Sequence, residues 1–162
     1  MKRIIVTTIL AALAVGVQAQ EAKFFQLSLT PDIAIHSRDT RIEGITLGIW
    51  DENPQSAFAW GFVNGSTGDS KGVSLALWNY SQNYKGFQWA FVNYSSERFG
   101  GLQLGAVNVA KEMHGVQWGT VNYCDTLKGV QIGLVNIVSS NPWFTDFPDK
   151  LAKGFIFVNW SF

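Results

Sequence analysis

Apolar and uncharged polar residues alternate along most of this chain, in a repeat of about 14 residues. The clearest copies read GLQLGAVN, GVQWGTVN and GVQIGLVN, and seven copies run from Gly44 to Asn136. If the glycine is position one, then positions two, four and six are nearly all apolar, whereas positions three and five are small or uncharged polar. This period of two predicts a β-strand with one apolar face. A repeat this short holds one strand and one turn, so we expect an all-β protein.

Two polar positions of the repeat supply the candidate functional residues. Position three is glutamine in the later copies, at Gln88, Gln103, Gln117 and Gln131. Position eight is asparagine in every copy after the first, at Asn64, Asn79, Asn93, Asn108, Asn122 and Asn136. Asparagine suits a turn because its side chain caps local backbone groups and it tolerates a left-handed conformation. We therefore expect the asparagines to form the repeat turn. The glutamines would line the lumen of a barrel, or form an exposed stripe on a solenoid.

Position four alternates between aromatic and aliphatic side chains in successive copies. It runs Leu47, Trp60, Leu75, Trp89, Leu104, Trp118 and Ile132. The structural unit is then two strands. An antiparallel meander explains this pattern because odd and even strands run in opposite directions, and a flattened parallel solenoid with two strands per coil explains it equally. Since the tryptophans share a face with leucine and phenylalanine, we expect them to be buried in a core or to face lipid.

The C-terminal segment favours a closed barrel. The chain ends inside a predicted strand on an aromatic residue, with Ile156, Val158, Trp160 and Phe162 on one face. This resembles the C-terminal strand signal of bacterial outer-membrane β-barrel proteins. An apolar face opposite a small polar face also suits a barrel with lipid outside and polar groups inside. The leading prediction is an antiparallel β-meander closed into an outer-membrane-like barrel of about 8–10 strands.

Two other features favour a β-solenoid as the alternative fold. Asparagine at the same position of successive strands would stack as a ladder in parallel coils. In addition, the apolar band formed by positions two, four and six is short for a bilayer. The alternation alone leaves both folds open, because each has one polar and one apolar strand face.

The N-terminus predicts export. Lys2 and Arg3 precede an apolar run over residues 4–17, and Val17-Gln18-Ala19 is a small-residue cleavage signature. We expect residues 1–19 to be a signal peptide and residues 20–162 to be a single β-repeat domain. Without Lys2 and Arg3, ten basic residues face twelve acidic ones, a net charge of −2 that gives no indication of nucleic acid as a partner.

The Gly-x-Gln-x-Gly-x-Val-Asn copies resemble a family of uncharacterised surface-repeat proteins from Gram-negative bacteria. That family carries tandem GVQIGLVN-type strands behind a signal peptide, and the resemblance covers about residues 44–162. The first three copies depart from the pattern, with Thr46, Ala59 and Ser74 in place of glutamine and Asp51 in place of the first asparagine. The resemblance implies export and placement in the outer membrane or at the cell surface. It implies nothing about chemistry.

The sequence gives no sign of a catalytic site, a cofactor or a metal centre. No nucleophile–base pair, carboxylate pair or phosphate-binding loop stands out. We expect His114 and Cys124, ten residues apart, to be unrelated turn residues rather than the start of a metal site.

The leading functional prediction is a non-enzymatic outer-membrane or cell-surface structural β protein. Its expected partners are outer-membrane lipid and the barrel-assembly machinery. The alternative is a secreted repeat-type binding module that presents a Gln/Asn stripe to a glycan or a protein.

Overall fold

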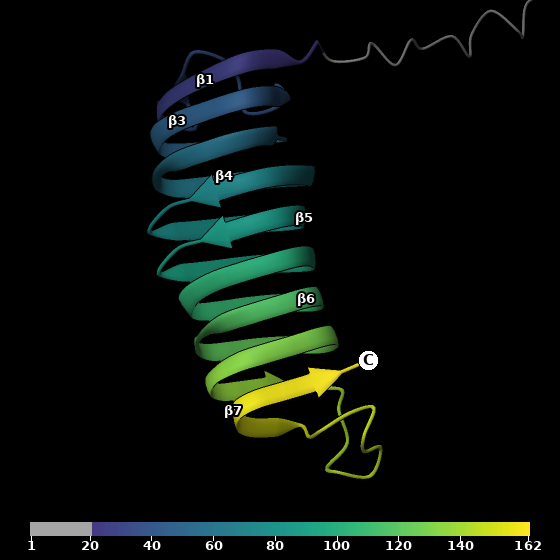
Figure 1. The fold of residues 1–162 in the computed structure, drawn as a ribbon. Coiled ribbons are helices and arrows are strands. Elements are labelled where there is room, and N and C mark those ends of the chain that lie inside the picture. The colour runs from purple at the N-terminus through teal and green to yellow at the C-terminus, as the bar shows by residue number, and fades with distance from the viewer. Residues whose placement is uncertain (1–20) are drawn as a thin grey trace, which may run out of the picture.

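In a computed structural model, which describes residues 21–162, the chain winds into a column of stacked coils, a β-solenoid (Figure 1). The predicted signal peptide lies outside the described residues. The strands are β1 (Lys23–Thr30), β2 (Ile33–Ala34), β3 (Ile42–Asn53), β4 (Ser56–Leu75), β5 (Trp78–Trp89), β6 (Val92–Val138) and β7 (Gly154–Ser161). They form one sheet in the order β2-β1-β3-β4-β5-β6-β7. Within residues 21–162, no helix is long and apolar enough to cross a membrane.

The structure is all-β, but the predicted antiparallel meander and barrel are wrong. β1 with β3, β3 with β4, β4 with β5, and β5 with β6 are all parallel pairs. Asn79 pairs with Asn93, and Gln88 pairs with Gln103, so each residue lies beside its equivalent in the next coil. The physical reason is that parallel register stacks like on like. An antiparallel meander would place the asparagines of neighbouring strands at opposite ends. The β-solenoid alternative is the observed fold.

The first glycine of the repeat is required where the coils approach most closely. Gly115 has a φ of 133°, which L side chains rarely adopt. A Cβ atom on Gly115 would lie 2.1 Å from the carbonyl oxygen of Gly101 in the preceding coil. The same conformation recurs at Gly72, Gly86, Gly101 and Gly129. Glycine therefore permits the close stacking of backbones at this corner of each coil.

An antiparallel strand lies at each end of the column, although β2 has only two residues and pairs only with Ser28 and Thr30 of β1. At one end β2 pairs with β1, and at the other end β7 pairs with the last coil of β6. Trp160 and Val158 pair with Val130 and Ile132, and Asn159 between them is buried. The aromatic C-terminal strand is thus a cap on a sheet edge rather than a closing strand of a barrel. Covering an edge removes the unpaired backbone groups that would recruit another chain.

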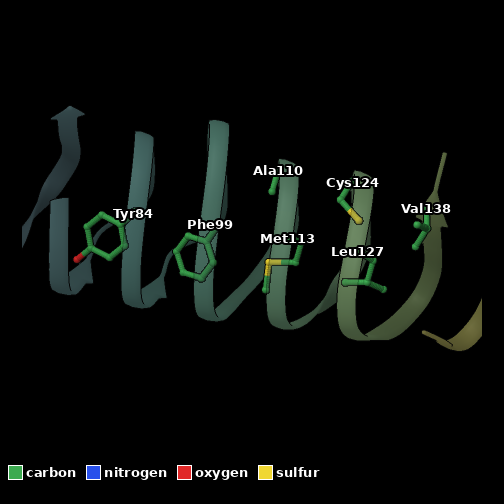
Figure 2. Close-up of a cluster of buried hydrophobic side chains, with 7 residues drawn as sticks. All are labelled: Tyr84, Phe99, Ala110, Met113, Cys124, Leu127 and Val138. Atoms are coloured by element: carbon green, nitrogen blue, oxygen red, sulfur yellow. The ribbon is translucent and has the colours of Figure 1, made fainter. Parts of the chain in front are cut away.

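The interior of the coils is narrow and mixed in polarity. Apolar side chains stack along the axis from one coil to the next, as Figure 2 shows, and they comprise Tyr84, Phe99, Ala110, Met113, Cys124, Leu127 and Val138. Tyr84 and Phe99 are stacked with ring centroids 5.8 Å apart. Where the large rings lie, Ser81 and Ser95 hydrogen-bond to each other from the neighbouring row. Small polar and large apolar side chains therefore lie together inside these coils.

Candidate functional site

The glutamines of position three form a buried ladder inside the solenoid. Gln88, Gln103, Gln117 and Gln131 are all 0% exposed. After Gln88, each Nε2 donates to the Oε1 of the glutamine in the preceding coil, over 3.2 Å from Gln103, 2.9 Å from Gln117 and 2.8 Å from Gln131. Identical amides that stack at the strand spacing satisfy one another, which offsets the cost of burying them.

The asparagines of position eight form a second buried ladder, and these side chains are also 0% exposed. Asn79, Asn93, Asn108 and Asn122 each donate Nδ2 to the Oδ1 of the next asparagine, over 2.8–2.9 Å. The same amide groups also donate to a backbone carbonyl of the next coil, for example Asn93 to Leu104 over 2.7 Å. The asparagines thus link successive coils, in addition to the turn role expected for them.

The two ladders point in opposite directions along the column. Asparagine amides donate towards the C-terminal coils, whereas glutamine amides donate towards the N-terminal coils. Each ladder ends in unpaired atoms. Within the described residues, the Nε2 of Gln88 and the Oε1 of Gln131 have no hydrogen-bond partner, and neither does the Oδ1 of Asn64. Because both ladders are enclosed, their amides present no surface to a glycan or a protein.

The exposed surface lies on the opposite side of the same strands and is apolar. Position four contributes Trp60, Trp89 and Trp118, whose side chains are 62%, 59% and 59% exposed. Position six contributes Phe62 and Phe91, at 58% and 67%. The expectation that the tryptophans are buried is therefore wrong. The interior rows are already filled by the amides and by the stacked apolar cluster, so the aromatic side chains of positions four and six point outward.

Positions four, five and six together form one long groove of about 1890 Å³. Position four forms one wall, position six forms the other, and small residues at position five form the floor between them. At Gly119 in this floor, a Cβ atom would lie 2.2 Å from the carbonyl oxygen of Gly105. Every residue of the described chain that lines the groove is uncharged. We call this surface the apolar groove.

Charged side chains gather at the other corner of the coils, in the segments between each asparagine and the next glycine. There Arg98 pairs with Glu112 over 2.9 Å, and Lys111 pairs with Glu97 over 3.0 Å, each across adjacent coils. These four side chains are 41–61% exposed, so solvent screens each pair and it contributes little to stability. We call this surface the charged edge. The solenoid is therefore amphipathic around its circumference.

Burial raises the pKa of three enclosed titratable groups, Asp51, Tyr84 and Cys124. Burial raises the pKa of the Cys124 thiol to about 12, and this sulfur accepts a hydrogen bond from Nε2 of Gln131 over 3.4 Å. Cys124 is an interior residue rather than the turn residue expected, and His114 is exposed. Burial is also the main cause that raises the pKa of Asp51 to about 7. A protonated, enclosed thiol is a poor nucleophile and metal ligand.

The site of interest is thus different from the residues singled out in the sequence. The glutamines and asparagines are brought together, but inside the fold. Of the C-terminal strand residues, Ile156 and Phe162 are exposed, at 57% and 72%, next to the last coil. Sequence reasoning missed the groove as a surface. Its signal was the alternation of tryptophan and leucine at position four beside a small residue at position five.

Comparison with protein-family models, with curated proteins and with solved structures finds no match.

Proposed function

We propose that this protein is an exported, non-enzymatic repeat module of the bacterial cell surface that acts by binding a partner through its apolar groove. The observation that carries the proposal is the separation of surfaces around the coil. Trp60, Trp89 and Trp118 stand exposed over an uncharged groove, whereas the charges lie along the opposite corner. Continuous exposed apolar surface of this extent is typical of an interaction site.

The arrangement of polar groups supports a binding role over a catalytic one. The side-chain amides of the two buried ladders hydrogen-bond to one another, as between Gln117 and Gln103 or Asn108 and Asn122. The ion pairs of the charged edge are exposed to solvent. The groove itself supplies shape and apolar contact rather than acid–base groups. Such a surface recognises an apolar partner along its length.

The leader-like N-terminus supports export, and the resemblance to bacterial surface-repeat proteins supports a place at the cell surface. A stack of coils with covered ends also suits a structural module, because each coil is stabilised by its neighbours. The module would hold the apolar groove rigidly in one extended conformation.

The test compares the full chain, expressed with its own leader, with the triple variant W60Q/W89Q/W118Q. Extracts prepared without detergent are analysed by sedimentation velocity. Wild type should sediment as a complex larger than one chain, and the triple variant as a single chain. The control is E97Q/K111Q/K128Q on the charged edge, which should sediment as wild type does. If wild type and the triple variant both sediment as single chains, and also behave alike in flotation with lipid vesicles, the groove is not a binding surface and the proposal fails.

A further inference from the structure

The position-four wall of the apolar groove has ridges and valleys along the solenoid axis. Trp60, Trp89 and Trp118 are exposed, whereas Leu75 and Leu104 in the intervening coils are half-buried. Strands in a sheet lie about 4.8 Å apart, so the ridges recur about every 10 Å. Position six adds a phenylalanine to the first two of these ridges. A surface with this period fits a partner that carries the same period.

We propose that the partner is a second copy of this chain, bound groove to groove with the two solenoids antiparallel. Trp89 of each copy then lies over Leu104 of the other. This inference rests on the proposed function, because it names the partner of the same apolar groove.

Symmetry selects the antiparallel arrangement. A two-fold axis parallel to the solenoid axis would place equivalent coils at the same height, so Trp89 would face Phe91 of the other copy and ridge would meet ridge. A two-fold axis that is perpendicular to the solenoid axis and passes between two coils reverses one copy and brings ridges opposite valleys. A parallel pair shifted by one coil would also interdigitate, but it does not close and would grow into open chains.

The sizes of the side chains select the register. The coil of Leu104 carries Ala106 at position six, the smallest residue in that row, and therefore forms the deepest valley. The neighbouring coil carries Trp89 and Phe91, and Phe91 is the most exposed aromatic residue of the groove, at 67%. Placing this ridge in that valley also brings Trp118 opposite Leu75 of the other copy.

The exposed area is large enough for a stable dimer. Positions four and six contribute five aromatic side chains to the groove, each 58–67% exposed, and together these present on the order of 600 Å². The aliphatic residues of the valleys bring the contact towards the roughly 800 Å² per partner of a standard interface. The uncharged lining lets both copies bury the groove without desolvating an ion.

The experiment measures the mass of the purified full-length protein by light scattering over a range of micromolar concentrations. Wild type should have the mass of two chains. L104W fills the valley while adding apolar surface, and it should raise the dimer dissociation constant about a hundredfold, because overpacking occurs at two symmetric contacts. The double variant W89L/L104W exchanges ridge and valley and should restore the dimer. T126W adds a tryptophan at an exposed position of the charged edge and should leave the dimer unchanged.

Circular dichroism and the melting temperature establish whether each variant folds. If L104W does not fold, the double variant W89L/L104W still tests the proposal. A single-chain mass for wild type overturns the inference, as does a double variant that stays monomeric.

Flotation with phosphatidylethanolamine/phosphatidylglycerol vesicles separates the two proposals. If monomeric wild type floats with vesicles, and the W60Q/W89Q/W118Q variant does not, lipid covers the groove. In that case the dimer is excluded and the proposed function stands. If wild type neither dimerises nor floats, and behaves as the triple variant does, both proposals fail.

Discussion

Asp51 and Asn64 lie in register in adjacent coils, and both side chains are fully buried in the row where the asparagine ladder begins. Every later step of that row from Asn79 onward has an amide Nδ2 that donates to the next Oδ1. At this step, within the described residues, both oxygens of Asp51 and the Oδ1 of Asn64 have no hydrogen-bond partner. A carboxylate offers no donor to Asn64, whereas a protonated carboxyl or an amide does.

The first prediction is that D51N stabilises the protein at neutral pH. An amide at residue 51 extends the ladder to Asn64 and removes a buried acid, and satisfying one buried polar pair contributes about 2 kcal/mol. The measurement is the midpoint of urea unfolding at pH 7.5. The matched control is N93D, which places an acid in the middle of the ladder. It keeps an acceptor for Asn79 but loses the bonds donated to Asn108 and to the carbonyl of Leu104, and it should lower the midpoint. A D51N midpoint at or below wild type would contradict this account.

The second prediction concerns pH. Burial raises the pKa of Asp51 in the folded protein to about 7, from an ordinary value of 3.8. The titratable groups that interact with it are Glu52, Tyr80 and Tyr84, none of which is cationic. Between these two pKa values the folded state binds more protons than the unfolded state. The free energy of unfolding should therefore fall as the pH rises from about 4 to about 7, by on the order of 4 kcal/mol in total.

Urea unfolding of wild type and D51N at half-unit pH steps measures this dependence. The difference between the two curves isolates residue 51 from the other titrating groups. The free energy of unfolding of D51N should rise relative to that of wild type as the pH rises to about 7, and the difference should then stay constant. A difference that stays constant across this range would show that Asp51 keeps an ordinary pKa in the folded protein.

The period of the sequence predicts the strands well, because alternation follows directly from strand geometry. It cannot say which face of the strand lies inside. Gln88 and Trp89 are neighbours on opposite faces, and ordinary hydrophobicity places the tryptophan in the core. In the structure Gln88 is buried and Trp89 is 59% exposed. The outcome depends on cooperation between coils, since one glutamine gains its hydrogen bonds only when the next coil is stacked in register.

The barrel prediction depended on the C-terminal strand, and there too the deciding contact is distant in sequence. Phe162 ends an alternating apolar segment in either fold. The pairing of Val158 with Ile132 makes that segment an antiparallel cap on the last coil. The asparagine at a fixed position in successive copies was the better indicator, because Asn79 and Asn93 form a ladder only when neighbouring strands are parallel and in register.

The third prediction is that loss of a central glutamine is more damaging than loss of a terminal one. Q117L removes a donor and an acceptor. The Oε1 of Gln103 loses its donor, whereas the Nε2 of Gln131 loses its ladder partner but still donates to the carbonyl oxygen of Ile137 over 3.1 Å and to the sulfur of Cys124 over 3.4 Å. One unsatisfied buried group costs about 1–3 kcal/mol, so the loss should be about 2 kcal/mol. Q88L affects only the bond from Gln103, whose Nε2 also donates to Ser95.

Unfolding of both variants in urea gives the comparison. Both variants replace a glutamine with a leucine, so the change in side-chain volume is the same at the two positions. The difference between the two losses of stability therefore reports the hydrogen bonds. Equal losses for Q117L and Q88L would mean that the ladder does not stabilise the interior.

The fourth prediction compares two adjacent glycines. Gly101 has a φ of 128°, and a Cβ atom there would lie 2.0 Å from the carbonyl oxygen of Gly86. At Gly100 the nearest neighbour of a Cβ atom would be the side chain of Lys85, at 3.8 Å. G101A must adopt a left-handed conformation and push two backbones apart, so it should cost at least about 3 kcal/mol. G100A should be neutral, or stabilise by about 0.4–1 kcal/mol through the unfolded state.

Thermal unfolding followed by circular dichroism measures the stability of both variants. G100A is the control for the general effect of replacing a glycine with an alanine in this strand. The loss in G101A should also be local in origin. Because each coil contacts only its neighbours, separating two backbones at residue 101 weakens the interface between two coils rather than the whole column. Hydrogen exchange should then show the largest loss of protection in the coils next to residue 101. A melting temperature for G101A equal to that of G100A would contradict the close stacking at this corner.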